Sequence, residues 1–262
     1  MSKALYKLER KSMLKTLLIF AIITALLSFV TIALYPVLQD VLAELSTKDL
    51  GVDLDKLIEM GSITEYFTAN MFQMWGLFGI IYACVLAVKL TSGSFKDKSF
   101  ELVYTLNISR TTIIKTKIVR LVLNILWFNL IAGVGAYVGL VSFAGISTFS
   151  TLNFLVYFLI TLIVTLISGF IAFALGLIAK HKFGTMAGVV LAMLFYFIVT
   201  AEQVSMTSWI GYLTPMTSLS ADIITTGFVA LKETWISLCV WAVVSALLVV
   251  TSVLKFKNDD LR

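Results

Sequence analysis

Residues 152–179 read LNFLVYFLITLIVTLISGFIAFALGLIA, a run of 28 residues without a charged side chain. The hydrocarbon core of a bilayer is about 30 Å thick, so a spanning helix needs about 20 mainly apolar residues. A spanning β-strand would instead show alternating polarity over about ten residues, and this run is continuously apolar. The stretch therefore predicts a transmembrane helix.

Five more stretches have the same character and are rich in Leu, Ile, Val, Phe and Ala. They cover 17–38, 71–90, 121–143, 183–201 and 234–254. Of the 262 residues, 60% are hydrophobic and 13% are charged, whereas a soluble domain has about 45–50% apolar and about 25% charged residues. We expect an all-α polytopic membrane protein with six transmembrane helices, forming a single transmembrane domain over residues 1–262.

Lysine and arginine are unevenly distributed among the segments that join these helices. Of the 20 basic residues, 17 lie before the first helix, between the second and third, between the fourth and fifth, or after the sixth. The remaining three are Lys48, Lys56 and Lys232. Because basic residues near helix ends stay on the cytoplasmic side, both termini are predicted to be cytoplasmic. The basic charge then faces anionic lipid, and a nucleic-acid partner is not needed to explain it.

Residues 1–15 predict an interfacial helix before the first span. Ala4, Leu5 and Leu8 share an arc opposite the basic side chains, as in helices that lie in the plane of the bilayer surface. A plain positively charged anchor is an equal alternative. At the other face, residues 202–233 are too apolar for a free loop and are interrupted by Pro215. They predict an outer re-entrant hairpin of two short helices packed against protein.

The region 94–110, between the second and third spans, predicts a cytoplasmic amphipathic helix. Phe95, Leu102 and Leu106 fall on one face of a helix of 3.6 residues per turn, and Glu101 falls on the opposite face. Such a helix either lies on lipid head groups or docks a soluble partner. Acidic groups within a basic segment favour a specific protein contact.

The sequence offers no catalytic constellation, so we do not expect an enzyme. The single histidine, His181, lies in a short cytoplasmic turn and cannot assist a nucleophile inside the bilayer. Residues 93–99 read GSFKDKS and lack the second glycine of a phosphate-binding loop. Asn124 and Asn129 are better explained as interhelical hydrogen-bonding groups than as ligands. Glycines in the third and fourth spans indicate close helix packing, at positions Gly133, Gly135, Gly139, Gly169 and Gly176.

Three motifs stand out, KSFELVYTLNISRTTIIKTK at 98–117, YLTPMTSLS at 212–220 and KFKNDDLR at 255–262. Together they resemble the ABC-2 type permeases, the membrane subunits of bacterial ATP-binding-cassette exporters with the type V fold. Residues 98–117, KSFELVYTLNISRTTIIKTK, are similar to that family's cytoplasmic segment, which has an acidic residue, a turn like TLPISR and a lysine-bearing helix. Asn107 replaces the usual proline. The tail KFKNDDLR at 255–262 and the stretch YLTPMTSLS at 212–220 also resemble the family's ending and its outer hairpin.

The resemblance implies a permease subunit of an ATP-driven exporter in the bacterial cell membrane. Its partners would be a second permease copy or paralogue and two ABC ATPase subunits, which would hold ATP and Mg²⁺, while this chain itself carries no cofactor. It further implies a coupling helix in the region 94–110 and a minor second contact at the fourth-to-fifth turn. The implied ATPase-coupling residues are Phe95, Lys98, Glu101, Leu102, Arg110, Lys180 and Lys182.

The resemblance also implies a substrate path at the dimer interface, lined by the first, second and fifth spans. The candidate lining residues are Phe29, Trp75, Phe78, Tyr82, Met193 and Tyr196. Aromatic and methionine side chains form adaptable apolar surfaces, which suit an amphipathic or hydrophobic substrate such as a peptide toxin, an antimicrobial peptide, an antibiotic or a lipid-like molecule. Two alternatives are a membrane sensor or immunity subunit of the same architecture and a stand-alone six-span facilitator.

Overall fold

The computed structural model describes residues 3–46, 66, 70, 72–96, 109–143, 145, 149–182, 184–205, 210–219 and 231–258. Every regular element within these ranges is helical. The elements are α1 (Lys3–Ser46), η1 (Phe72–Leu77), α4 (Phe78–Val88), η2 (Lys89–Gly93), α5 (Ser94–Lys96), α7 (Arg110–Phe143), α8 (Thr151–Ala179), η3 (Lys180–Lys182), α9 (Thr185–Ser205), η4 (Ile210–Leu213), η5 (Pro215–Ser218) and α11 (Leu231–Asn258).

Five of these segments are long and apolar enough to cross a membrane. They are Met13–Leu38 in α1, Trp75–Gly93, Arg110–Phe143, Thr151–Ala179 and Thr234–Asn258. The fifth predicted span is present as α9, but its apolar part, Thr185–Ala201, is shorter. The prediction of an all-helical, membrane-type chain is therefore confirmed, with five full-length apolar helices in the described ranges and one shorter one.

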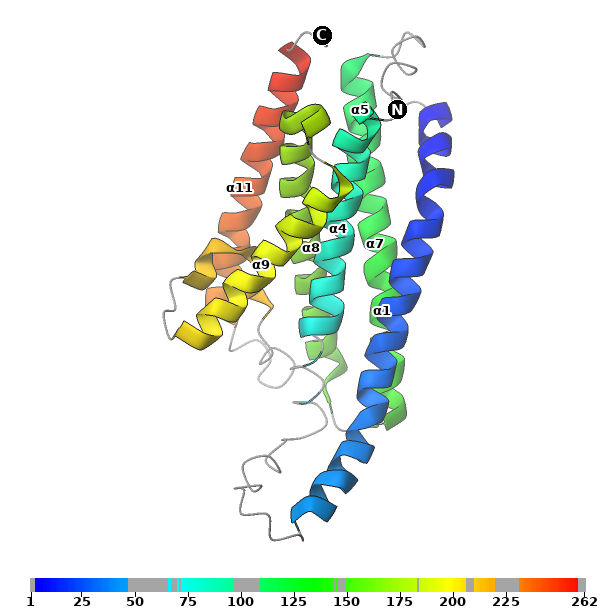
Figure 1. Ribbon diagram of the computed structural model, residues 1–262, viewed down its shortest axis with the longest axis vertical. Helices are drawn as coiled ribbons and strands as arrows, with labels where there is room; N and C mark the ends of the chain where they lie inside the picture. Colours follow the sequence, from blue (N-terminus) through cyan, green and yellow to red (C-terminus); the bar gives the residue numbers. More distant parts are fainter. Residues whose placement is uncertain are drawn as a thin grey trace.

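The long helices stand side by side, and Figure 1 shows their arrangement. α4 and α8 pack against each other, α7 packs against both α8 and α1, and α11 packs against the other side of α8. α9 crosses in front of this layer at an oblique angle and packs against α4. The chain ends, marked N and C, lie at the same end of the bundle, together with α5 and the start of α7. We call this the basic end.

Small residues let the helices approach closely. A Cβ atom added at Gly135 would lie 2.6 Å from the Cβ of Ala25, and one added at Gly139 would lie 2.7 Å from Cδ1 of Ile32. These two glycines form a small-xxx-small motif on α7 that is filled by α1 of the same chain. Gly188 of α9 lies directly on the α4 backbone. The prediction that the glycines of the third span serve helix packing is confirmed.

A buried polar hub joins three helices near the middle of the bundle. The indole N–H of Trp75 donates to Oδ1 of Asn129 at 3.2 Å, and Nδ2 of Asn129 donates to Oγ1 of Thr165 at 3.0 Å. Thr165 in turn donates to the carbonyl of Thr161 at 2.9 Å. Polar groups inside a membrane protein must be satisfied internally, because lipid offers no partner. The predicted role of Asn129 as an interhelical hydrogen-bonding group is confirmed.

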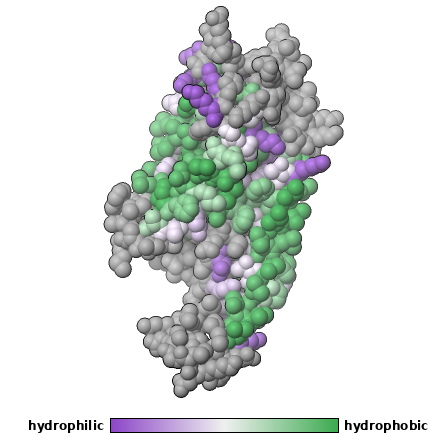
Figure 2. Space-filling model, in the orientation of Figure 1, coloured by the Kyte–Doolittle hydropathy of each residue, from purple (hydrophilic) through white to green (hydrophobic). Residues whose placement is uncertain are grey.

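The outer faces of the bundle are apolar, as expected for contact with lipid. Figure 2 shows an extensive hydrophobic surface over α1 and α9, with hydrophilic residues toward the basic end. On α1 and α9, large apolar side chains recur on the exposed face at helical spacing, including Ile19, Ile22, Leu26, Val30, Met186, Val190, Leu194 and Phe197. α1 and α11 are the least buried of the long helices, and α4 is the most buried.

One predicted element differs in the structure, and another is only partly described. The interfacial helix expected at 1–15 is not a separate element, because residues 3–15 form the first turns of the uninterrupted helix α1, which continues past Pro36 to Ser46. The hairpin expected at 202–233 is described only in part. Between α9 and α11 the structure shows the short 3₁₀ segments η4 and η5, and Pro215 begins η5, where the missing N–H of proline is harmless.

Candidate functional site

Both borders of the predicted coupling region are held against the last turns of α11. Phe95, in α5, is 8% exposed and meets the ring of Phe256 edge to face at a centroid distance of 6.1 Å. Arg110, the first residue of α7, donates from Nη1 to the carbonyl oxygens of Phe256 at 3.5 Å and of Lys257 at 3.2 Å. A guanidinium is favourable there, because the last carbonyls of a helix have no partner within the helix and carry partial negative charge.

A lysine of α7 binds the end of the α4 span that lies at the basic end. Lys117 of α7 is 3% exposed, and its Nζ donates to the Leu90 carbonyl at 2.7 Å and to Oγ of Ser94 at 2.8 Å. Ser92 donates to the carbonyl of Gly176 on α8 at 2.8 Å. The backbone here is π-helical over Lys89–Gly93, which leaves carbonyl groups for side-chain donors to satisfy. α4, α7 and α8 are thus joined by hydrogen bonds at the point where the coupling region starts.

The second predicted contact lies beside the first. α8 ends at Ala179, and the chain turns through Lys180, whose φ of 50° lies in the left-handed region that non-glycine residues rarely adopt. The short helix η3 that follows contacts both η2 and α5. Lys182 is exposed at this surface. Of the predicted coupling residues, Phe95, Arg110, Lys180 and Lys182 therefore gather at the basic end, whereas Lys98, Glu101 and Leu102 lie outside the described residues.

Two of the predicted path residues are buried inside the bundle. Trp75 is fully buried among Phe154, Tyr157 and Phe158, with ring centroids 5.8 to 6.1 Å away, and it belongs to the polar hub. Tyr82 is 1% exposed and stacks on Phe128 at 4.8 Å. These two side chains pack inside the bundle.

The other four predicted path residues are half-buried. Phe29 of α1 contacts Phe143 of α7 edge to face, at a centroid distance of 5.5 Å. Phe78 lies on α4, and Met193 and Tyr196 lie on α9. Among the described residues, two cavities bordered by α7 have none of the six path residues in their linings.

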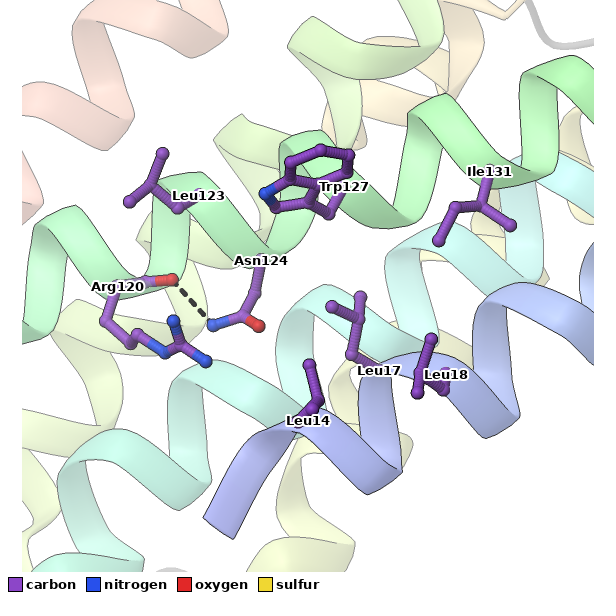
Figure 3. A pocket seen from close by; sticks show the side chains of 8 residues that line it. All are labelled: Leu14, Leu17, Leu18, Arg120, Leu123, Asn124, Trp127 and Ile131. Carbon is purple, nitrogen blue, oxygen red and sulfur yellow. Dashed lines mark hydrogen bonds between the residues drawn. The ribbon is translucent and has the colours of Figure 1, made fainter. Parts of the chain in front are cut away.

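The larger of these cavities opens between α1 and α7, near the basic end, and sequence reasoning did not identify it. Its volume is about 460 Å³, and Figure 3 shows the eight side chains that line it. Six are apolar or aromatic, namely Leu14, Leu17, Leu18, Leu123, Trp127 and Ile131. The other two are Arg120, which is 5% exposed, and Asn124, which is 1% exposed. The amide of Asn124 donates to the backbone carbonyl of Arg120 at 2.8 Å.

The cavity combines a buried cation with a hydrocarbon-like wall. Figure 3 shows the guanidinium of Arg120 and the amide of Asn124 in the space between the α7 and α1 ribbons. The spacing of Arg120, Asn124 and Trp127 on one helical face was the available signal in the sequence. The opposite wall of the cavity belongs to α1, more than 100 residues earlier in the sequence. The spacing on α7 alone therefore does not define a cavity.

No metal-binding group emerges from the described side chains. Among them, no three His, Cys, Asp or Glu residues come together. In comparisons with known proteins, no family model matches this chain, and neither a curated protein nor a solved structure does.

Proposed function

We propose that this chain is the permease subunit of an ATP-driven exporter of the ABC-2 type. In the proposed assembly it pairs with a second permease copy or paralogue and with two ATPase subunits that bind ATP and Mg²⁺. The substrate class is an amphipathic or hydrophobic molecule, such as a peptide, an antibiotic or a lipid-like compound. The all-helical membrane architecture and the segment 98–117 support this proposal.

One structural observation supports it most directly. At the basic end α5 contacts both η3 and the end of α11, although the three elements come from distant parts of the sequence. An ATPase subunit that changes conformation can move the spans only through elements that are attached to them. Here the hydrogen bond from Lys117 links α7 to η2, the end of the span that contains α4. The hydrogen bond from Ser92 links η2 to α8. Force applied at this surface would therefore reach three long helices.

We also propose that the basic end faces the cytoplasm, on the basis of the distribution of lysine and arginine. The test is cysteine labelling in intact cells with a membrane-impermeant maleimide, after both native cysteines have been replaced. A cysteine at position 55 should react from outside, and one at position 98 should react only after the cells are permeabilised. The reverse pattern would invert the topology.

The proposed function is tested by isolating the tagged full-length chain from its native membranes in mild detergent and measuring Mg²⁺-dependent ATP hydrolysis. We expect a copurifying ATPase that has a phosphate-binding loop. The charge reversal Lys182→Glu, at an exposed position of η3, should reduce the copurified activity several-fold. The matched reversal Lys115→Glu, at an exposed position of α7, should leave it nearly unchanged. Phe95 is unsuitable for this purpose because it is buried against Phe256.

Two results would contradict the proposal. One is a purified, transport-competent chain without any ATPase, which would favour a stand-alone facilitator. The other is a copurifying ATPase whose hydrolysis never responds to Lys182→Glu or to Glu101→Ala. That result would remove the basic-end surface from the coupling mechanism.

A further inference from the structure

The cavity between α1 and α7 has the features of a lipid-binding site. Its apolar wall is continuous with the bilayer-facing surface, since Leu14 and Leu18 are each 41% exposed and Trp127 is 56% exposed. Arg120 and Asn124, both more than nine-tenths buried, form its polar part. A molecule in this cavity would place hydrocarbon along the leucines and an oxygen-bearing group beside the guanidinium.

The depth of Arg120 matches the boundary between head groups and hydrocarbon. α7 contains 34 residues, so at about 1.5 Å per residue it is about 51 Å long, well above the hydrocarbon thickness of about 30 Å. Arg120 lies ten residues, or about 15 Å, after the start of α7 and about 35 Å before its end. The side chain therefore falls near the edge of the hydrocarbon at the basic end, where lipid phosphates lie.

Charge complementarity identifies the class of lipid. A guanidinium has five N–H donors in a planar fork that matches a phosphate, so it can serve contacts within the chain and a ligand together. The sequence at the start of α1, the helix on one side of the cavity, holds five basic residues whose charge attracts anionic head groups, and these are Lys3, Lys7, Arg10, Lys11 and Lys15. A zwitterionic lipid would bring a positively charged ammonium group close to these basic residues.

We propose that this cavity binds one anionic phospholipid from the surrounding leaflet, with its phosphate beside Arg120 and Asn124 and an acyl chain against Leu18, Trp127 and Ile131. The occupant is a membrane lipid and not a free anion, because six of the eight lining side chains are apolar or aromatic. The site does not depend on the proposed transport function, and the chain alone suffices to test it.

The experiment uses Trp127 as the reporter. The full-length chain is reconstituted in phosphatidylcholine nanodiscs with increasing fractions of phosphatidylglycerol that carries brominated acyl chains, which quench nearby tryptophans. The same titration with brominated phosphatidylcholine measures non-selective contact. Subtracting the signal of Trp127→Phe isolates Trp127 from the other four tryptophans. We expect half-maximal quenching at about a tenfold lower fraction of the anionic lipid, since charge-assisted hydrogen bonds to phosphate are strong.

Two variants separate the site from general electrostatics. Arg120→Gln should bring the half-maximal quenching fractions of the two lipids to within about twofold of each other. Lys115→Gln removes an exposed charge from the same helix and should preserve the preference for the anionic lipid. If Arg120→Gln fails to fold, Leu18→Phe narrows the cavity while Arg120 is kept, and it should also reduce the preference. Because Leu18 is already 41% exposed, folding should tolerate that change.

The outcomes that would overturn the proposal are equally specific. Equal quenching of the wild-type chain by both lipids would make Trp127 an ordinary lipid-facing residue. A preference that Lys115→Gln abolishes as fully as Arg120→Gln would reduce the effect to surface charge. Reversal of the quenching by inorganic phosphate would indicate a free-anion site, and resistance to it supports a lipid site.

Discussion

Gly188 marks a contact between the backbones of α9 and α4, and replacing it with alanine tests whether α9 crosses the bundle as described. An added Cβ would lie 2.8 Å from the Cys84 oxygen, 2.9 Å from the Cys84 carbonyl carbon and 2.9 Å from Cα of Val85. These are backbone atoms of a helix, so no side-chain rotation relieves the overlap. Carbon atoms normally approach to about 3.5–4.0 Å, and α9 would therefore have to retreat by about 0.6–1 Å.

The expected loss follows from two opposing effects. Overpacking of this kind costs about 1–3 kcal/mol in unfolding free energy, while glycine to alanine inside a helix gains about 0.5–1 kcal/mol. Gly93→Ala is the matched control, because its added Cβ would meet no atom closer than 3.6 Å. We therefore expect Gly188→Ala to be less stable than Gly93→Ala by about 1–3 kcal/mol.

The assay is reversible unfolding in mixed micelles, in which added sodium dodecyl sulfate is the denaturant and circular dichroism reports helix content. Both variants are measured against the wild-type chain at the same lipid composition. Equal midpoints for Gly188→Ala and Gly93→Ala would refute the reasoning, since they would show that α9 does not contact the α4 backbone at this glycine.

The same unfolding assay tests three further side chains. Lys117→Met should lower the unfolding free energy by about 2–3 kcal/mol, because it removes two charge-assisted hydrogen bonds, whereas Lys115→Met, at an exposed position, should stay within about 0.5 kcal/mol. Asn129→Leu should cost about 1–3 kcal/mol by leaving a buried indole N–H unsatisfied. Asn124→Leu should cost less, because among the described residues Asn124 donates to a carbonyl of its own helix, and equal costs would contradict the hub. Tyr82→Phe should be neutral or slightly stabilising, because among the described residues its buried hydroxyl has no hydrogen-bond partner, and a loss above about 1 kcal/mol would reveal a partner.

The sequence predicted the class of this protein because the bilayer imposes a simple requirement on a chain. A run such as 152–179 must be a helix in lipid, since only a helix satisfies its backbone without neighbours. The roles of Asn129 and of the packing glycines also followed from residue type, because small and amide side chains have few other uses at that depth. The coupling residues Lys98, Glu101 and Leu102 remain predictions from the sequence pattern.

The rotation of each helix could not be read from residue type. Trp75 and Tyr82 are aromatic residues on a lipid-length helix, and the sequence allowed them to face a substrate path, a partner or the core. The structure directs them inward, because α7 and α8 supply Asn129, Phe128 and Phe158 as neighbours. The interfacial helix expected at 1–15 merges into α1 for a local reason, because residues 3–15 contain no proline or glycine that would end the helix.

Local pattern determined the apolar helices, the basic end and the small-residue contacts, since each depends on residues within a few turns of one another. Tertiary structure alone decided the cavity at Arg120. Its two walls, on α1 and α7, are separated by about a hundred residues, and neither wall is a pocket by itself. A site formed between two helices depends on how they pack, and that packing is the sum of many small contacts along the whole length of both helices.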